Sequence, residues 1–146
     1  MIKHLGQVQL PAGLAGVARK LAIDNAPSCG SHEVDRNTPG EPGAYAWGLV
    51  EDLLIDKPHE DFCFLVFRQV VEHTDKWGYI YRNGRHLLPG FLHVVVYGKA
   101  SVKLGRNVLH VERGDMFVMD TSKKHSVISD TLCATVTATV ALCDYR

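Results

Sequence analysis

The segment 132–142 constrains the fold of this chain more than any other part of its sequence. Its side chains alternate between two sets, with Val136, Val140 and Leu142 on one face and Thr135, Thr137 and Thr139 on the other. A period of two residues indicates a strand and excludes an amphipathic helix. Because threonine suits both a polar barrel lumen and a solvent-exposed strand face, the sequence leaves open which of the two this row lines.

Further β-type segments precede this strand, and turn signals separate them. Aromatic and β-branched residues mark the segments 62–71, 78–84, 91–97, 108–111 and 116–119. The dipeptides Asn83-Gly84 and Pro89-Gly90 are typical of the turns between such segments. Many short strands joined by regular turns predict a mainly β fold, either a sandwich or a barrel.

The first sixty residues follow a different pattern. Apolar residues at helical spacing predict a short helix over 12–24, with Pro11 at its start and Asn25 and Pro27 at its end. A second helical stripe covers 47–54, and a Gly/Pro-rich loop covers 26–43. We therefore expect residues 1–61 to form an N-terminal extension with short helices and a long loop. Residues 62–146 then form the β-barrel, and the two parts make one compact domain.

The charge balance excludes several classes of function. In 146 residues Lys+Arg and Asp+Glu both number 16, whereas nucleic-acid-binding proteins usually carry an excess of base. No apolar run approaches the roughly 20 residues that span a bilayer, and the first residues show no secretory signal. We therefore expect a cytoplasmic protein that binds neither nucleic acid nor membrane. The four cysteines form no C-x-x-C pair, which excludes a zinc ribbon, and we expect buried, reduced thiols.

Glycines and histidines recur at a regular spacing from Gly78 onward. Gly78, His86 and Gly98 are followed, after a short linker, by Gly114 and His125. This spacing resembles the two sequence motifs of the cupin superfamily, over about residues 62–142. His86 stands at the second histidine position of the first motif, and His125 stands at the histidine position of the second. The resemblance implies a cupin-like jelly-roll β-barrel, in agreement with the strand pattern, and the homodimer that is common in the superfamily.

The resemblance is incomplete at the positions that would bind a metal. Cupin enzymes hold Fe, Mn, Ni or Zn with three histidines and one glutamate, but here Gly84 and Phe91 replace the first histidine and the glutamate. His86 and His125 alone fall short of the three or so ligands of a catalytic metal site. His93, which shares the side-chain direction of Phe91, is the candidate third ligand. We therefore expect an eroded site with no cofactor, unless a third ligand completes a site for a divalent transition metal.

Three further residues are candidates for binding a small ligand. Tyr97 and Asp120 are candidate acid and base partners of His86 or His125, as in the metal-free cupins that isomerise sugar nucleotides. The same two residues are equally candidates for holding structural histidines by hydrogen bonds. Thr137 is a candidate if the threonine row lines the barrel lumen.

Three functions remain open at this stage. The first is a non-catalytic, cupin-like binding or regulatory module with an eroded metal site and no assigned catalytic residue. Lys123 and Lys124, beside His125, favour a small anionic ligand or an acidic protein partner for such a module. The second is a metal-dependent cupin enzyme, an oxygenase or isomerase of a small molecule. The third is a small interaction protein that regulates or inhibits a larger protein partner through the 26–43 loop.

Overall fold

The computed structural model describes residues 2–35, 38–53, 62–73, 81–82, 85–121, 123–130 and 134–144. In these ranges the elements are, in chain order, β1 (Ile2–Gln7), α1 (Leu14–Asn25), β2 (Ser31–Val34), α2 (Pro42–Val50), a 3-10 helix η1 (Glu51–Leu53), β3 (Phe62–Phe67), β4 (Gln69–His73), β5 (Tyr81–Arg82), β6 (Arg85–Tyr97), β7 (Lys99–Leu104), β8 (Asn107–Glu112), β9 (Asp115–Met119), β10 (His125–Ser129) and β11 (Thr135–Asp144).

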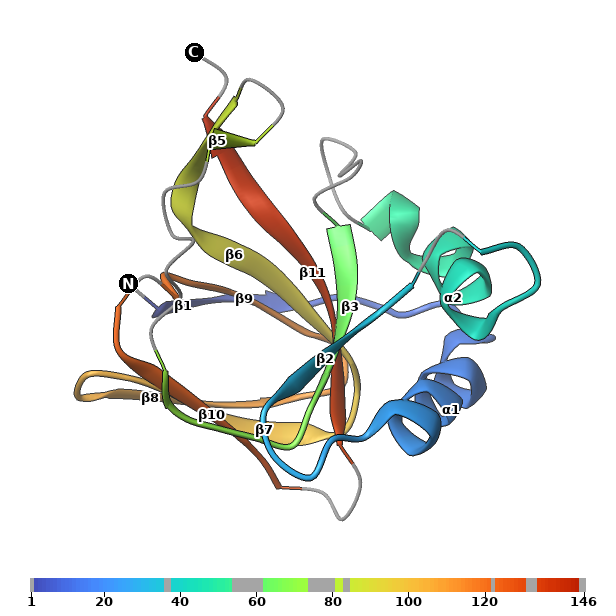
Figure 1. Cartoon of the computed structure of the whole chain (residues 1–146), viewed down its shortest axis with the longest axis horizontal. Helices are drawn as coiled ribbons and strands as arrows, with labels where there is room; N and C mark the ends of the chain where they lie inside the picture. The colour runs from blue at the N-terminus through green and yellow to red at the C-terminus, as the bar shows by residue number, and fades with distance from the viewer. Residues whose placement is uncertain are drawn as a thin grey trace.

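The strands form two antiparallel sheets (Figure 1). The larger sheet has the order β1-β9-β6-β11-β3-β2, with β5 paired to β6, and the smaller has the order β4-β10-β7-β8. Neighbouring strands are often distant in sequence: β6 lies beside β11, with His93 opposite Thr139 and Val95 opposite Thr137. The prediction of a mainly β, jelly-roll-like fold is confirmed.

Each predicted β segment contains a strand, but Pro89-Gly90, predicted as a turn, lies within β6, and the sequence analysis misses β1, β2, β7 and β10. Most side chains of β1 and β2 are exposed, so these two edge strands carry no apolar alternation to detect. The segment 62–71 is also not one strand. It divides at Arg68 into β3 of the larger sheet and β4 of the smaller sheet. Residues 78–80, 83–84, 132 and 133 of the predicted segments lie outside the described residues.

The N-terminal residues combine predicted helices with unpredicted strands. The helix expected over 12–24 is confirmed as α1, and the second helical stripe lies in α2 and η1. The loop expected over 26–43 contains β2 and the first two residues of α2. Because β1 pairs with β9 and β2 pairs with β3, two strands from the N-terminal sixty residues form the two ends of the strand order of the larger sheet. No described helix is long and apolar enough to cross a membrane.

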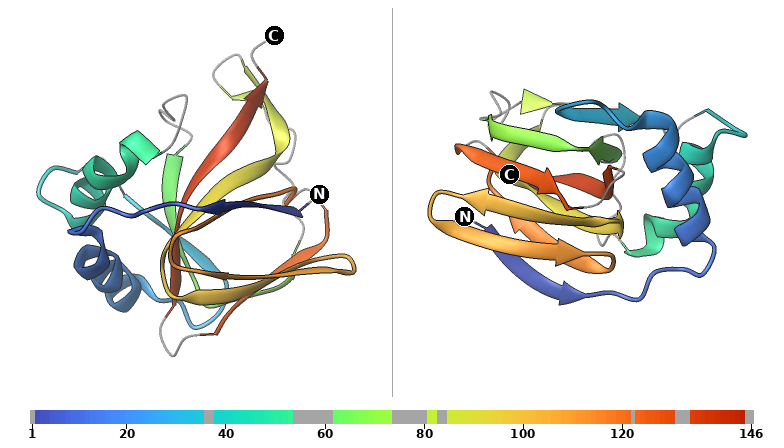
Figure 2. Two further views of the ribbon diagram at one scale, coloured as in Figure 1. Left: turned by 180° about the vertical axis from the view of Figure 1, so that it is seen from behind. Right: turned by 90° about the horizontal axis from the view of Figure 1, so that it is seen from below.

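Two apolar cores hold these layers together. The helices cover the outer face of the larger sheet (Figure 2), where Leu14 and Leu21 of α1 share one buried cluster with Val94 and Val96 of β6. A second cluster lies between the two sheets and includes Val95 from the same strand. Since successive side chains of a strand point to opposite faces, β6 contributes to both cores.

One cysteine departs from the expected burial. Cys29 is exposed, and its thiol lies 3.3 Å from the backbone carbonyl oxygen of Gln69, to which it donates a hydrogen bond. Cys63 is half-buried. The side chains of the two remaining cysteines lie outside the described residues. The prediction of four buried thiols is therefore wrong at Cys29, because the polar loop before β2 leaves it at the surface.

The turn between β8 and β9 depends on one carboxylate. Asp115 accepts a hydrogen bond of 2.7 Å from the backbone N–H of Glu112, and its Oδ1 lies 2.9 Å from His4 Nε2. Burial favours the neutral acid, but these two bonds and one from Gln7 outweigh burial and lower the pKa of Asp115. The ionised carboxylate therefore fastens the start of β9 to both the turn and β1.

Replacing this group by Asp115→Asn is expected to lower the free energy of unfolding at pH 7 by about 1–2 kcal/mol. The native pKa of Asp115 lies below its ordinary value of 3.8, so the contribution is full above that pH and is lost as the pH falls through the lowered pKa. Urea unfolding at pH 7 and pH 3 measures both effects. Asp24→Asn is the control, because its pair with Lys20 is exposed and exposed ion pairs contribute little. Equal losses in the two variants would contradict the prediction.

Candidate functional site

The threonine row of β11 is buried and faces the space between the two sheets. Thr135, Thr137 and Thr139 are all buried. Thr137 lies opposite Val95, a residue of the core between the sheets, whereas the alternate residues Val136 and Ala138 join the core beneath the helices. Of the two orientations that the sequence left open, the threonines therefore take the inward one.

The hydroxyls of these threonines form hydrogen bonds within the protein. Thr135 Oγ1 donates to the backbone carbonyl of Lys99 at 2.8 Å, and the hydroxyls of Thr137 and Thr139 lie 2.9 Å apart.

His93 is the centre of this polar cluster. Its Nδ1 lies 3.1 Å from Oγ1 of Thr139, its partner in the strand register. Its ring stacks on that of Phe117, with 4.8 Å between the centroids and 13° between the planes. The pKa of His93 is lowered to about 3, mainly by burial and to a smaller extent by the charge of His125. At neutral pH the buried ring is therefore an uncharged imidazole.

His125 approaches from the smaller sheet, where it begins β10. The ring is buried, and Nδ1 lies 2.8 Å from the backbone carbonyl oxygen of Lys123. Because a carbonyl only accepts hydrogen bonds, Nδ1 of His125 carries a proton and donates it to this oxygen. The effect of His125 on the pKa of His93 means that the two rings interact electrostatically across the space between the sheets.

The metal site implied by the cupin resemblance is incomplete in the described part of the chain. Among these side chains, no group of three or more His, Cys, Asp or Glu residues is placed to hold a metal ion. His86 lies in β6 with its backbone opposite Asp144, but its side chain and that of Phe91 are outside the described residues. Imidazole suits Fe, Ni and Zn, yet His93 and His125 are fewer than the three or so ligands of a catalytic site. The described residues alone therefore do not fit a bound metal.

The other candidates are placed differently. Tyr97 packs against the core beneath the helices and does not join the cluster of His93. Asp120 follows β9 and is buried, and its backbone carbonyl accepts a hydrogen bond of 3.3 Å from the N–H of Lys123. The structure thus joins Thr137 to His93 through Thr139, whereas Tyr97 lies elsewhere. Thr121, beside Asp120, is buried with no hydrogen-bond partner for its hydroxyl among the described residues.

Two residues of the cluster are absent from the sequence-based candidates. Thr139 shares the face of Thr137, so the alternation of the strand was sufficient to find it. Phe117 carries no such signal, because it meets His93 only through the pairing of β6 with β9. Those two strands are separated in the chain by β7 and β8, and the sequence does not indicate which distant segments pair.

The sequence matches no protein-family model and no curated protein. Among solved structures, a cupin-2 domain protein from Shewanella frigidimarina is 14% identical over 57% of this chain and 72% of its own, with a TM-score of 0.38. A protein of unknown function from Rhizobium leguminosarum is 12% identical over 94% of this chain and 98% of its own, with a TM-score of 0.46. Salicylate 1,2-dioxygenase from Pseudoaminobacter salicylatoxidans is 14% identical over 88% of this chain and 30% of its own, with a TM-score of 0.42. The chain resembles cupin-fold proteins, and these include both enzymes and proteins of unknown function.

Proposed function

We propose that this protein is a binding module that holds a small, uncharged molecule between its two sheets without catalysing a reaction. The observation that supports the proposal is the buried cluster of His93, Thr139, Thr137 and His125. A polar group buried among apolar side chains costs free energy, and the imidazole of His93 is buried against the ring of Phe117. Buried titratable groups with strongly shifted pKa values are typical of functional sites.

The charge state of the cluster indicates the class of ligand. His93 is neutral at pH 7 because its pKa is about 3, and Thr137 and Thr139 carry no charge. An anion transferred to this site would lose its hydration without meeting a cation on any of these three side chains. Lys123 and Lys124, which favoured an anionic ligand in the sequence, are exposed to solvent. An uncharged ligand with hydrogen-bonding groups therefore suits the side of the cluster formed by His93, Thr137 and Thr139 better than an anion.

Benzamide and benzoate are matched probes for this proposal, because they share a ring and a size but differ in charge. Benzamide is expected to shift the imidazole NMR signals of His93 and His125, and benzoate to bind at least about tenfold more weakly. The variant His125→Asn keeps a donor for the Lys123 carbonyl and is expected to weaken benzamide binding. His110→Asn is the control, since His110 lies on the exposed face of β8. Shifts at neither imidazole with either probe would contradict the proposal.

A second candidate function is a metal-dependent enzyme, and one observation favours it. In both His93 and His125, Nδ1 is bonded to a protein oxygen. Metal-binding histidines commonly have this arrangement, in which one ring nitrogen bonds the protein and the other faces the metal. If a third ligand from outside the described residues completed the set, the metal would act as a Lewis acid or redox centre, with His93 and His125 holding it.

Elemental analysis separates the two functions. Protein purified without chelators, and then soaked with Fe, Mn, Ni and Zn, is expected to contain far less than one metal ion per chain. The same measurement on the variants His86→Ala and His125→Asn tests whether these two histidines bind the metal. His110→Asn is the control. A content near one metal ion per chain that is lost in His86→Ala and His125→Asn but kept in His110→Asn would contradict the proposed binding module. It would support the metal-dependent enzyme instead.

A further inference from the structure

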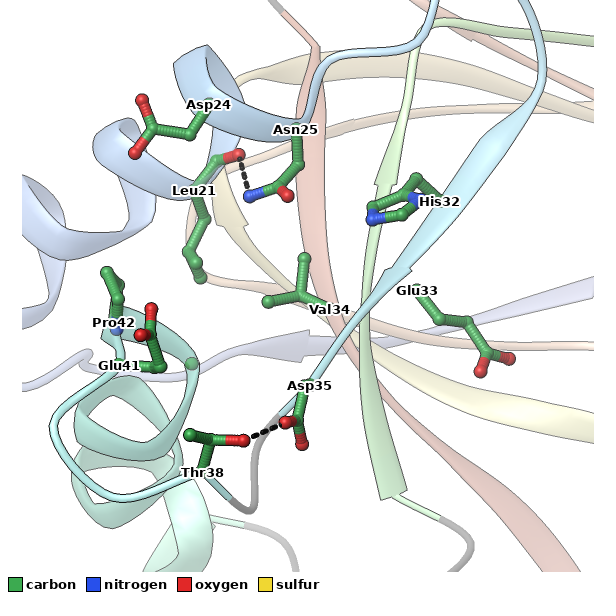
Figure 3. A pocket seen from close by; sticks show the side chains of 11 residues that line it. Leu21, Asp24, Asn25, His32, Glu33, Val34, Asp35, Thr38, Glu41 and Pro42 are labelled. Carbon is green, nitrogen blue, oxygen red and sulfur yellow. Dashed lines mark hydrogen bonds between the residues drawn. The ribbon is translucent and has the colours of Figure 1, made fainter.

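A surface pocket lies far from the histidine cluster, where α1, β2 and α2 meet (Figure 3). Its volume is about 490 Å³. Leu21 of α1 and Val34 of β2 point into the space between the three elements and give it an apolar floor. The walls are the end of α1, the strand β2 with the following Asp35, and the start of α2. None of the described residues that line the pocket belongs to β3, so the pocket borders the side of β2 that faces away from β3.

That side of β2 is an open sheet edge. β2 is the last strand of the larger sheet, and in the described part of the chain it pairs only with β3. In an antiparallel strand, alternate residues turn their N–H and C=O groups toward either neighbour, so part of the backbone of β2 points away from β3. Such an edge is a template for another extended chain, and four residues of strand span about 13 Å.

The α2 helix keeps this edge uncovered next to the pocket. Gly43, at the start of α2, is buried against the backbone carbonyl of Asp35, directly after β2. Thr38 donates a hydrogen bond to the carboxylate of Asp35 and so fastens the other side of the same turn. These contacts hold α2 at the end of β2 rather than along it, and the pocket remains between them.

The rim of the pocket is acidic. Among the described residues that line it, four are carboxylates and none is a lysine or arginine: Asp24, Glu33, Asp35 and Glu41. Lys20 neutralises one of them, because its Nζ lies 2.8 Å from Asp24 Oδ2. Lys20 also interacts with Glu41, but one lysine against four carboxylates leaves the described rim with a net negative charge, which favours a cationic occupant. A second copy of this chain, paired through the same edge, would bring two such sets of carboxylates together, and like charges oppose that arrangement.

We propose that the open edge of β2 and the adjoining pocket bind an extended, basic peptide segment of a partner protein, which adds a strand to the larger sheet. Backbone hydrogen bonds to β2 supply affinity that does not depend on sequence, whereas the carboxylates select lysine or arginine side chains. This surface is independent of the histidine cluster, so it operates whether or not the barrel binds a small molecule.

Three capped heptapeptides test the proposal with the intact protein. The first alternates lysine with threonine, the second alternates glutamate with threonine, and the third alternates lysine with proline, which cannot donate a backbone hydrogen bond. The lysine–threonine peptide is expected to shift the backbone amide NMR signals of residues 31–35. It is expected to bind at least about tenfold more tightly than the glutamate peptide and to weaken as salt screens the charges. The lysine–proline peptide is expected to bind more weakly than the lysine–threonine peptide.

Matched variants locate the charges. The double variant Glu33→Gln, Glu41→Gln is expected to weaken the lysine–threonine peptide by about fivefold to tenfold. Glu112→Gln, on the distant strand β8, is expected to leave binding unchanged. Equal affinity for the lysine and glutamate peptides, or shifts confined to residues away from β2, would overturn the proposal. Concentration-dependent dimerisation with the same shifts at residues 31–35 would overturn it in favour of a second copy as the occupant.

Discussion

Acidification from pH 6.5 to pH 3 is expected to remove up to about 4–5 kcal/mol of stability through the single side chain of His93. The pKa of His93 is 6.5 in an ordinary environment and about 3 in the folded protein. The unfolded chain therefore binds this proton more readily than the folded one. The stability is fully present above pH 6.5 and declines as the pH falls toward the folded pKa, by at most about 1.4 kcal/mol per pH unit.

Urea unfolding at several pH values between 7.5 and about 3.5 measures this slope, and His93→Gln removes it. The glutamine keeps a polar partner for Thr139 but does not titrate, so the free energy of unfolding of this variant is expected to depend less on pH. His110→Gln is the control, because it removes a histidine from an exposed strand face. An imidazole NMR titration of the wild-type protein tests the same point without a variant. A midpoint for His93 near pH 6.5 would contradict the prediction.

Gly43→Ala is expected to destabilise the protein by about 2–3 kcal/mol, although alanine is the better helix former. A Cβ atom at this position would overlap the backbone carbonyl oxygen of Asp35, and it would lie 3.1 Å from Cγ1 of Val34. Backbone atoms cannot rotate away as a flexible side chain does, so α2 and β2 have to move apart. The expected result is a lower urea midpoint, and weaker binding of the lysine–threonine peptide beside β2.

Gly48→Ala provides the matched control within the same helix. A Cβ atom there would meet nothing within 4 Å. Replacing a glycine in a helix interior by alanine reduces the entropy of the unfolded chain, so this variant is expected to gain about 0.5–1 kcal/mol. The two substitutions are chemically identical and differ only in what surrounds the added methyl group. A loss of stability in both variants, or a gain in both, would contradict the account of Gly43 as a contact between α2 and β2.

The candidate site is built on strands of both sheets. The His93 ring, the Thr139 hydroxyl and the Phe117 ring come from three neighbouring strands of one sheet, and His125 comes from the opposite sheet. Each is held by regular backbone pairing rather than by a loop, so their relative positions are well defined. The pocket beside β2, in contrast, lies at the edge of the larger sheet, where the backbone of another chain can add a strand.

The sequence by itself determined the strand character of the segments that form β3, β8, β9 and β11, the helix α1, and the histidines from which a site could be built. These features are local, since a period of two or of 3.6 residues is visible within one segment. The same alternation placed Thr139 on the face of Thr137, although Thr139 was not among the candidate site residues.

Only the tertiary structure decided which face of that alternation is buried inside the barrel. The helices cover the side of Val136 and Ala138, and this leaves Thr137 and Thr139 to face His93. The strand register likewise decided that Tyr97 lies apart from the cluster while Phe117 belongs to it. The edge strands β1 and β2 exist because β9 and β3 offer them backbone hydrogen bonds, and not because their own residues demand it. Pairing between distant segments is a property of the whole chain, and no single segment encodes it.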